Sequence, residues 1–77
     1  MGIKLKPILQ KIMSILKKEK FYIKRMKGSH IILNREPKLR RPIIIPNKNK
    51  LSNAVRQNLI NQCKEIDINT EKLEELF

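Results

Sequence analysis

The stretch FYIKRMKGSHIILN, residues 21–34, decides the fold that this sequence predicts. Residues 21–26 and 29–34 are both rich in β-branched and aromatic side chains, a composition typical of strands. Lys27-Gly28 lies between them, and glycine readily adopts the positive φ that a tight hairpin requires. The stretch therefore predicts two antiparallel strands joined by a two-residue turn.

The residues on either side of this hairpin extend the sheet and supply a helix to cover it. In residues 6–19 the apolar positions recur at the spacing of one helix face, and Pro7 suits the first turn, where its missing N–H costs nothing. Residues 39–46 carry the run Ile43-Ile44-Ile45 and predict a third strand. Pro42 cannot donate a ladder hydrogen bond, which places this strand at a sheet edge.

The C-terminal part of the chain predicts two further helices. Ser52 or Asn53 is the expected cap of a helix that runs to about residue 64. Asp67 or Asn69 is the expected cap of a short last helix. The apolar residues of these two helices are Val55, Leu59, Cys63, Leu73, Leu76 and Phe77.

The order of elements is then a helix, three antiparallel strands, a helix and a short extra helix. It predicts one α+β domain over residues 1–77, in which helices cover one face of a strand meander. This α-β-β-β-α two-layer order is also that of double-stranded-RNA-binding domains, although the order of elements alone does not establish function.

The positive charge of the chain is concentrated in its first 64 residues. The net charge is +11, and residues 1–64 hold 17 Lys and Arg against two acidic residues, a net charge of +15. Residues 65–77 hold five acidic residues against one lysine, a net charge of −4. A basic body attracts a polyanion, because phosphate neutralisation supplies most non-specific affinity for nucleic acids. The alternative is a solvated, self-repelling surface, but so large an excess favours a polyanionic partner.

Few residues of this chain can do chemistry. The single cysteine, Cys63, excludes an internal disulfide, and its place in a helical pattern favours a small core residue. Cys63 and His30 cannot make up the ligand set of a zinc site, so we expect no metal and no cofactor. No apolar run has the length of a membrane span or of a secretory segment, and we expect a cytoplasmic protein.

His30 is the remaining candidate for catalysis. It follows the turn at the start of the second strand, and Arg25 would lie directly across from it if the hairpin loop is only Lys27-Gly28. An imidazole can accept a proton from a ribose 2′-OH, which then attacks the adjacent phosphate, while fixed cations stabilise the charge that develops there. The alternative is a half-exposed strand histidine without a chemical role, since lone histidines are usually structural.

The surroundings of the predicted turn also supply a surface for partners. The expected RNA-binding residues are Lys24, Arg25, Lys27, Gly28, Ser29, Lys48 and Lys50. An exposed apolar strand residue such as Ile32 would give a desolvated centre to an interface with an acidic protein.

The chain resembles the HicA (YcfA-like) family of toxins, which are small mRNA interferases of bacterial and archaeal toxin–antitoxin pairs. The resemblance rests on an Ile- and Leu-rich helix followed by residues 21–30, FYIKRMKGSH, where the family has a strand, an Arg/Lys-rich turn and Gly-Ser-His. It continues through Ile44-Ile45-Pro46, a polar Lys-containing loop, a closing helix and a short acidic helix. It covers nearly the whole chain in order and length. Gly-Ser-His alone is a weak motif, and this context makes it moderately specific.

The resemblance implies a double-stranded-RNA-binding-domain-like fold, metal-independent cleavage of mRNA with His30 as the catalytic residue, and a cognate HicB-type antitoxin that covers the active site. Many members carry a second histidine where this chain has Ile31, and another where it has Asn47. If either assists catalysis, this chain cleaves more slowly or only binds. The closing helix also lacks the usual glycine before its end. The leading hypothesis is a toxin-type endoribonuclease, and the alternative is a non-catalytic RNA-binding module of the same fold.

Overall fold

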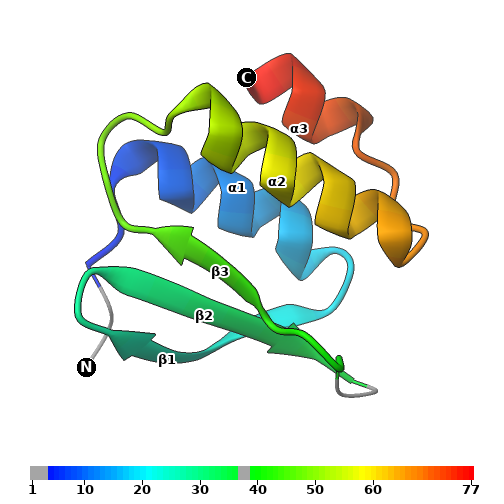
Figure 1. The fold of residues 1–77 in the computed structure, drawn as a ribbon, viewed down its shortest axis with the longest axis horizontal. Coiled ribbons are helices and arrows are strands. Elements are labelled where there is room, and N and C mark those ends of the chain that lie inside the picture. Colours follow the sequence, from blue (N-terminus) through cyan, green and yellow to red (C-terminus); the bar gives the residue numbers. More distant parts are fainter. Residues whose placement is uncertain (1–3, 37–38) are drawn as a thin grey trace.

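The helices and the sheet of this protein form two layers. The computed structural model describes residues 4–36 and 39–77, and Figure 1 shows the helices of this part of the chain on one face of a three-stranded antiparallel sheet. In chain order the elements are α1 (Pro7–Lys17), β1 (Phe21–Lys27), β2 (His30–Arg35), β3 (Ile43–Pro46), α2 (Asn53–Glu65) and α3 (Glu71–Leu76). None of these helices combines the length and apolar character that a membrane crossing needs. The predicted α+β class and element order are confirmed.

Helix α1 begins at Pro7, because proline in the first turn lacks an N–H that would have no partner within the helix. The helix ends at Lys17, two residues earlier than expected, because residues 18–20 form a turn in which Lys20 has a φ of 67°. This left-handed residue redirects the chain into β1. The residues that α1 buries are Leu9, Ile12, Met13 and Leu16.

Strands β1 and β2 form the predicted hairpin, but their turn is Gly28-Ser29 and Lys27 pairs with His30. Gly28 has a φ of 60°, as glycine does at the first central position of a type II′ turn. A Cβ at Gly28 would meet no atom within 4 Å, so the backbone conformation alone demands glycine there. The prediction that the turn is Lys27-Gly28 is wrong by one residue, because the glycine opens this turn and does not close it.

A register irregularity in β1 sets which side chains share a face of the sheet. Ile23 lies opposite Leu33, whereas Arg25 lies opposite Ile32, so one extra residue, Lys24, forms a β-bulge between them. Beyond the bulge Met26 faces the helices, and Arg25 and Lys27 face the other way.

Strand β3 lies at the sheet edge, as Pro42 predicts, but it spans only Ile43–Pro46. The prediction of a strand over 39–46 is wrong at its beginning, because the backbone N–H of Leu39 donates to Oδ1 of Asn34 at 2.9 Å and does not enter the ladder. The same oxygen accepts the N–H of Arg35 at 2.8 Å. Asn34 is 1% exposed and thus anchors the β2–β3 connection at the far end of the sheet.

The two C-terminal helices begin close to the expected residues. Ser52 caps α2, with its Oγ accepting the N–H of Val55 at 3.2 Å. Thr70 precedes α3, and the neighbouring Asn69 accepts the N–H of Glu71 through its Oδ1 at 2.8 Å. Asp67 is not a cap, since it has a φ of 60° in the turn after α2.

The core lies between the sheet and the helices. Ile31 and Leu33 of the central strand are at most 1% exposed, and the helical residues packed with them include Leu9, Ile12, Leu16, Leu59, Cys63 and Leu73. Because side chains alternate along a strand, His30, Ile32 and Asn34 of β2 face away from the helices. We call this second side the outer sheet face. Its residues are Tyr22, Arg25, Lys27, His30, Ile32, Asn34, Ile44 and Pro46.

Cys63 is a core residue, as its helical register predicts, and this gives a testable property. Its side chain is fully buried, and this burial raises the pKa of the thiol to about 11, with a smaller lowering effect of Arg35 and a smaller raising effect of Glu19. The neutral thiol is the form that the fold favours. The contribution of the neutral thiol to stability is therefore present below the ordinary thiol pKa of 9.0 and lost as the pH rises through about 11.

We expect a disulfide reagent to modify Cys63 of the native protein at pH 8 at least about 100-fold more slowly than in the unfolded chain, because reaction requires local opening. Equal rates in buffer and in denaturant would contradict this.

Candidate nucleic-acid interface around His30

His30 stands on the outer sheet face, at the end of the molecule where β1 turns into β2. It is the first residue of β2 and is exposed, and its cross-strand neighbours are Lys27 on β1 and Pro46 on β3. Ile31 is buried beneath the helices, so alternation along the strand directs His30 to the other side. The middle strand thus holds an imidazole that is open to solvent and has a lysine beside it.

Lys27, and not Arg25, is the cation directly across from His30. Opposite residues of antiparallel strands have Cβ atoms about 5 Å apart. Arg25 lies opposite Ile32, diagonal to the histidine, at about 7–8 Å, which a long side chain can still bridge. The predicted Arg25–His30 pairing is wrong because the turn begins one residue later than expected. Both cations nevertheless share the outer sheet face with His30.

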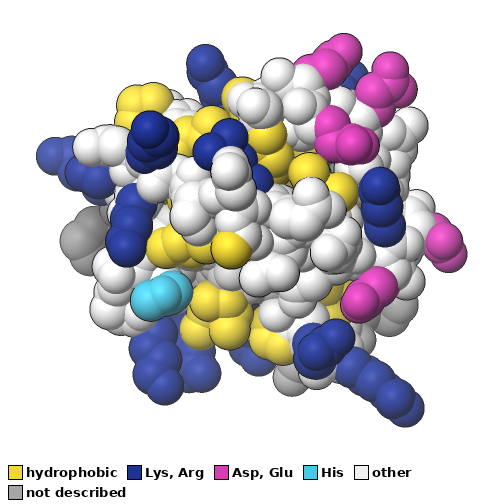
Figure 2. Space-filling view, turned by 45° about the horizontal axis from the view of Figure 1, so that its top comes forward, with side chains coloured by type: hydrophobic (Ala, Val, Ile, Leu, Met, Phe, Trp, Pro, Cys, Tyr) yellow, Lys and Arg dark blue, Asp and Glu magenta, His cyan; other side chains and the backbone are white. Residues whose placement is uncertain are grey.

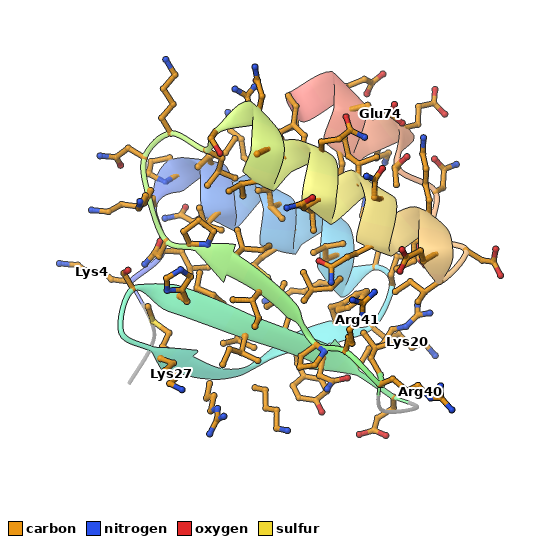
Figure 3. The ribbon with its side chains drawn as sticks, viewed as in Figure 1. Lys4, Lys20, Lys27, Arg40, Arg41 and Glu74 are labelled. Atoms are coloured by element: carbon orange, nitrogen blue, oxygen red, sulfur yellow. The ribbon has the colours of Figure 1, made fainter. Side chains whose placement is uncertain are left out.

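Asn47 ties three segments together at this end of the molecule. Its N–H donates to the carbonyl of Ser29 in the turn at 2.7 Å. Its side-chain Oδ1 accepts the N–H of Lys6 at 3.0 Å, and its Nδ2 donates to the carbonyl of Lys4 at 2.9 Å. Lys4 thereby joins this end of the molecule, and Figure 3 shows it on the same side as Lys27. Sequence reasoning missed Lys4 and Lys6, because no local pattern signals a contact with a residue 43 or 41 positions away.

The structure separates the other predicted RNA-binding residues. Lys48 is exposed just after β3, its N–H bound to the carbonyl of Pro46 at 3.1 Å, so it stays at the His30 end. Lys24 is exposed at the bulge of β1. Lys50 borders a pocket of about 150 Å³ between the three helices and therefore belongs to the helical layer. Other residues around that pocket are Ile8, Arg56, Leu76 and Phe77.

The acidic side chains visible in Figure 2 lie on one side of the molecule, whereas lysine and arginine side chains lie on both sides. Figure 2 shows the histidine beside lysine and arginine side chains at one side, with the visible acidic side chains on the other. Glu74 lies on α3 in the helical layer, away from Lys27 (Figure 3). Arg41 and Glu65 form an ion pair of 3.7 Å, and since both are more than 60% exposed it adds little stability. The visible acidic side chains are therefore separated in space from His30, while cations lie on both sides.

The site is an open surface, because Lys27, Gly28, Ser29 and His30 are all exposed. An extended polymer could lie across it without a cleft having to open. Across residues 4–36 and 39–77, no group of three or more His, Cys, Asp and Glu side chains comes together in a way that could hold a metal ion. The chemistry that these residues offer is proton transfer by an imidazole beside fixed positive charges.

Comparison with known proteins finds no relative of this chain. No family model matches the chain, and neither a curated protein nor a solved structure matches it.

Asn47→Ala tests whether the N-terminal lysines belong to the interface. The variant loses both hydrogen bonds to residues 4–6, so we expect the free energy of unfolding to fall by about 1 kcal/mol. We also expect weaker binding of a single-stranded RNA at low salt, because Lys4 and Lys6 are no longer held near the turn. Denaturant unfolding and fluorescence anisotropy measure the two effects. Asn49→Ala, an exposed asparagine of the same loop, is the matched control, and identical behaviour of the two variants would contradict the role of Asn47.

Proposed function

We propose that this protein is a toxin-type endoribonuclease, an mRNA interferase that binds RNA through its basic side and cleaves it without a metal ion. The observation that carries the proposal is the exposed His30 on an open face, directly across from Lys27 and diagonal to Arg25. The His30 side chain lies outside the core, so core packing does not require a histidine at this position. A polyanionic substrate is what a site surrounded by cations attracts.

In the proposed reaction His30 accepts the proton of a ribose 2′-OH as the O2′–P bond forms. The P–O5′ bond breaks, and the leaving 5′ oxygen takes a proton from a water molecule, which in turn takes the proton that His30 has accepted. The products are a 2′,3′-cyclic phosphate and a 5′-hydroxyl end. Lys27 and Arg25 stabilise the negative charge that develops on the phosphate oxygens in the transition state. RNA supplies its own nucleophile, so one imidazole is sufficient for slow cleavage.

The order of the elements supports an RNA-binding fold, because it is that of double-stranded-RNA-binding domains with a short helix added. The resemblance to HicA toxins supports the same function. At the two positions where many of those toxins carry another histidine, this chain uses the residue structurally: Ile31 is 1% exposed in the core, and Asn47 holds residues 4–6. The proposed proton transfer therefore depends on His30 alone.

An acidic HicB-type antitoxin is the protein partner that belongs to this proposal, and the basic side offers it charge complementarity. The expectation that Ile32 is an exposed apolar centre for such an interface is wrong. Ile32 is 7% exposed because it lies between Arg25 and Ile44 on the neighbouring strands. Ile44, at 53% exposed, is the apolar side chain that this face presents.

His30→Gln and His30→Ala test the catalytic role. If His30 transfers the proton, each variant should lose about 10²–10⁴-fold of the cleavage rate. The fold should survive, because the side chain is exposed, and RNA binding should survive, because lysine and arginine carry it. Cleavage of a labelled RNA, anisotropy and thermal unfolding give the three readouts, with Asn49→Ala as the control. Cleavage at the wild-type rate by folded His30→Gln would refute the mechanism. Binding without cleavage by the wild type would favour the non-catalytic RNA-binding module.

Cleavage by the wild-type protein should continue at an unchanged rate in an excess of EDTA, because neither the nucleophile nor the proposed base is a metal-bound group. The measurement is the rate of cleavage with and without the chelator. Loss of cleavage in EDTA that added Mg²⁺ or Zn²⁺ restores would place the chemistry elsewhere.

A further inference from the structure

The outer sheet face extends the His30 site into a larger surface. None of the helices covers it, as Figure 1 shows, and it presents the two large hydrophobic side chains that stand exposed among the described residues. These are Tyr22, 41% exposed on β1, and Ile44, 53% exposed on β3. Ile32 of the central strand lies between Arg25 of β1 and Ile44 of β3, and these neighbours leave it 7% exposed. Ile32 and Ile44 thus lie in the middle of this face beside Arg25, and Tyr22 lies toward the end of the sheet away from His30.

Cations lie at both ends of the outer sheet face. At the His30 end are Lys27 and Lys4, and Figure 3 shows Lys20 and Arg40 at the other end of the sheet, where Arg41 pairs with Glu65 of α2. Arg25 lies within the face, directly across from Ile32. None of the eight residues that make up the outer sheet face is acidic. A ligand that complements the face therefore carries negative charge along its length and flat apolar groups between the charges.

We propose that the outer sheet face binds single-stranded RNA, with an unpaired base stacked on Tyr22, a neighbouring base against Ile44, and the sugar–phosphate chain held by Arg25 and Lys27 on its way to His30. This proposal rests on the function proposed above and names the form of the substrate. Unpaired bases stack on exposed aromatic side chains, whereas the bases of a duplex are covered by their own neighbours. Cleavage by attack of a 2′-OH likewise needs a flexible strand that can bring this oxygen in line with the P–O5′ bond.

The dimensions of the sheet fit a short segment of such a strand. Tyr22 lies opposite Asn34, which is four residues along β2 from His30. At about 3.3 Å per residue, the two positions are about 13 Å apart. Sheets that bind RNA through exposed aromatic residues hold about two or three bases over a comparable surface. A base on Tyr22 and a scissile phosphate at His30 can thus belong to one short segment.

Tyr22 provides a direct spectroscopic test, because it is the only tyrosine of the chain and there is no tryptophan. The probe is a single-stranded 2′-O-methyl RNA of about six nucleotides, whose blocked 2′ oxygens prevent cleavage. We expect this RNA to shift the ring proton signals of Tyr22 upfield in the NMR spectrum of the wild-type protein. A duplex of the same sequence should leave these signals in place. RNA binding measured by anisotropy without a shift at Tyr22 would overturn the proposal and leave the proposed function standing. Absence of any RNA binding would overturn both.

Variants of the same face provide the second test. Tyr22→Ser should weaken binding of the single strand by about 10-fold or more, while Tyr22→Phe, which keeps the ring, should bind almost as the wild type does. Ile44→Glu adds a negative charge to the face and should weaken binding by a similar factor. Gln57→Glu adds the same charge on an exposed position of α2 and should have little effect. All three positions are exposed, and thermal unfolding confirms that the four variants fold. If Tyr22→Ser and Ile44→Glu retain full RNA affinity and lose only the capture of an acidic protein partner, the face is a protein interface and the proposal is wrong.

Discussion

The alternation of side chains along the central strand β2 is the constraint on which the rest of this structure depends. Ile31 and Leu33 fill the space between the sheet and the helices, and their burial determines the register of the strand. A slip by one residue would expose both of them and move His30 and Asn34 into the apolar core. The exposure of His30 is therefore a consequence of the packing of its neighbours. The site and the core are two faces of one strand.

Two asparagines connect this framework to the segments that have no regular structure. Asn34 holds the β2–β3 connection at one end of the sheet, and Asn47 holds residues 4–6 and the turn at the other. An amide side chain can accept and donate at the same time, which lets Asn47 bind both the N–H of Lys6 and the carbonyl of Lys4. Polar contacts therefore hold the connecting segments at the two ends of the sheet, whereas apolar contacts hold its middle against the helices. Lys4 and Lys6 owe their positions to the contacts of Asn47, whereas strand pairing places Lys27 and Arg25.

The separation of charge follows from the way the acidic C-terminus packs. Helix α3 rests against α1, where a pocket is lined by Lys18 and Lys72 as well as by Glu19, Glu71 and Glu75. The acidic residues are thus placed beside cations of the helical layer and reduce the repulsion there. None of the eight residues of the outer sheet face is acidic, so the cations near His30 receive no such compensation from that face. Its positive field remains available to a polyanion, which is the basis of both RNA proposals.

Local features of the sequence predicted most of the fold. Pro7 marked the start of α1, Gly28 marked the hairpin, Pro42 marked the edge strand, and the helical spacing of Cys63 placed it in the core. These features act within a few residues, through backbone angles and side-chain periodicity, so they can be recognised in a single chain. The location of His30 beside a turn with cations nearby followed from the same kind of reasoning.

The tertiary structure decided the remaining features, each of which depends on contacts between distant residues. The glycine can open or close a two-residue turn, and only the pairing of β1 with β2 puts Lys27 opposite His30. The bulge at Lys24 and the early diversion of Leu39 arise where strand pairing competes with burial and with the Asn34 side chain. Lys4 enters the site through Asn47, 43 positions along the chain. Such contacts depend on how whole elements pack, and side-chain periodicity carries no information about which distant residues will meet.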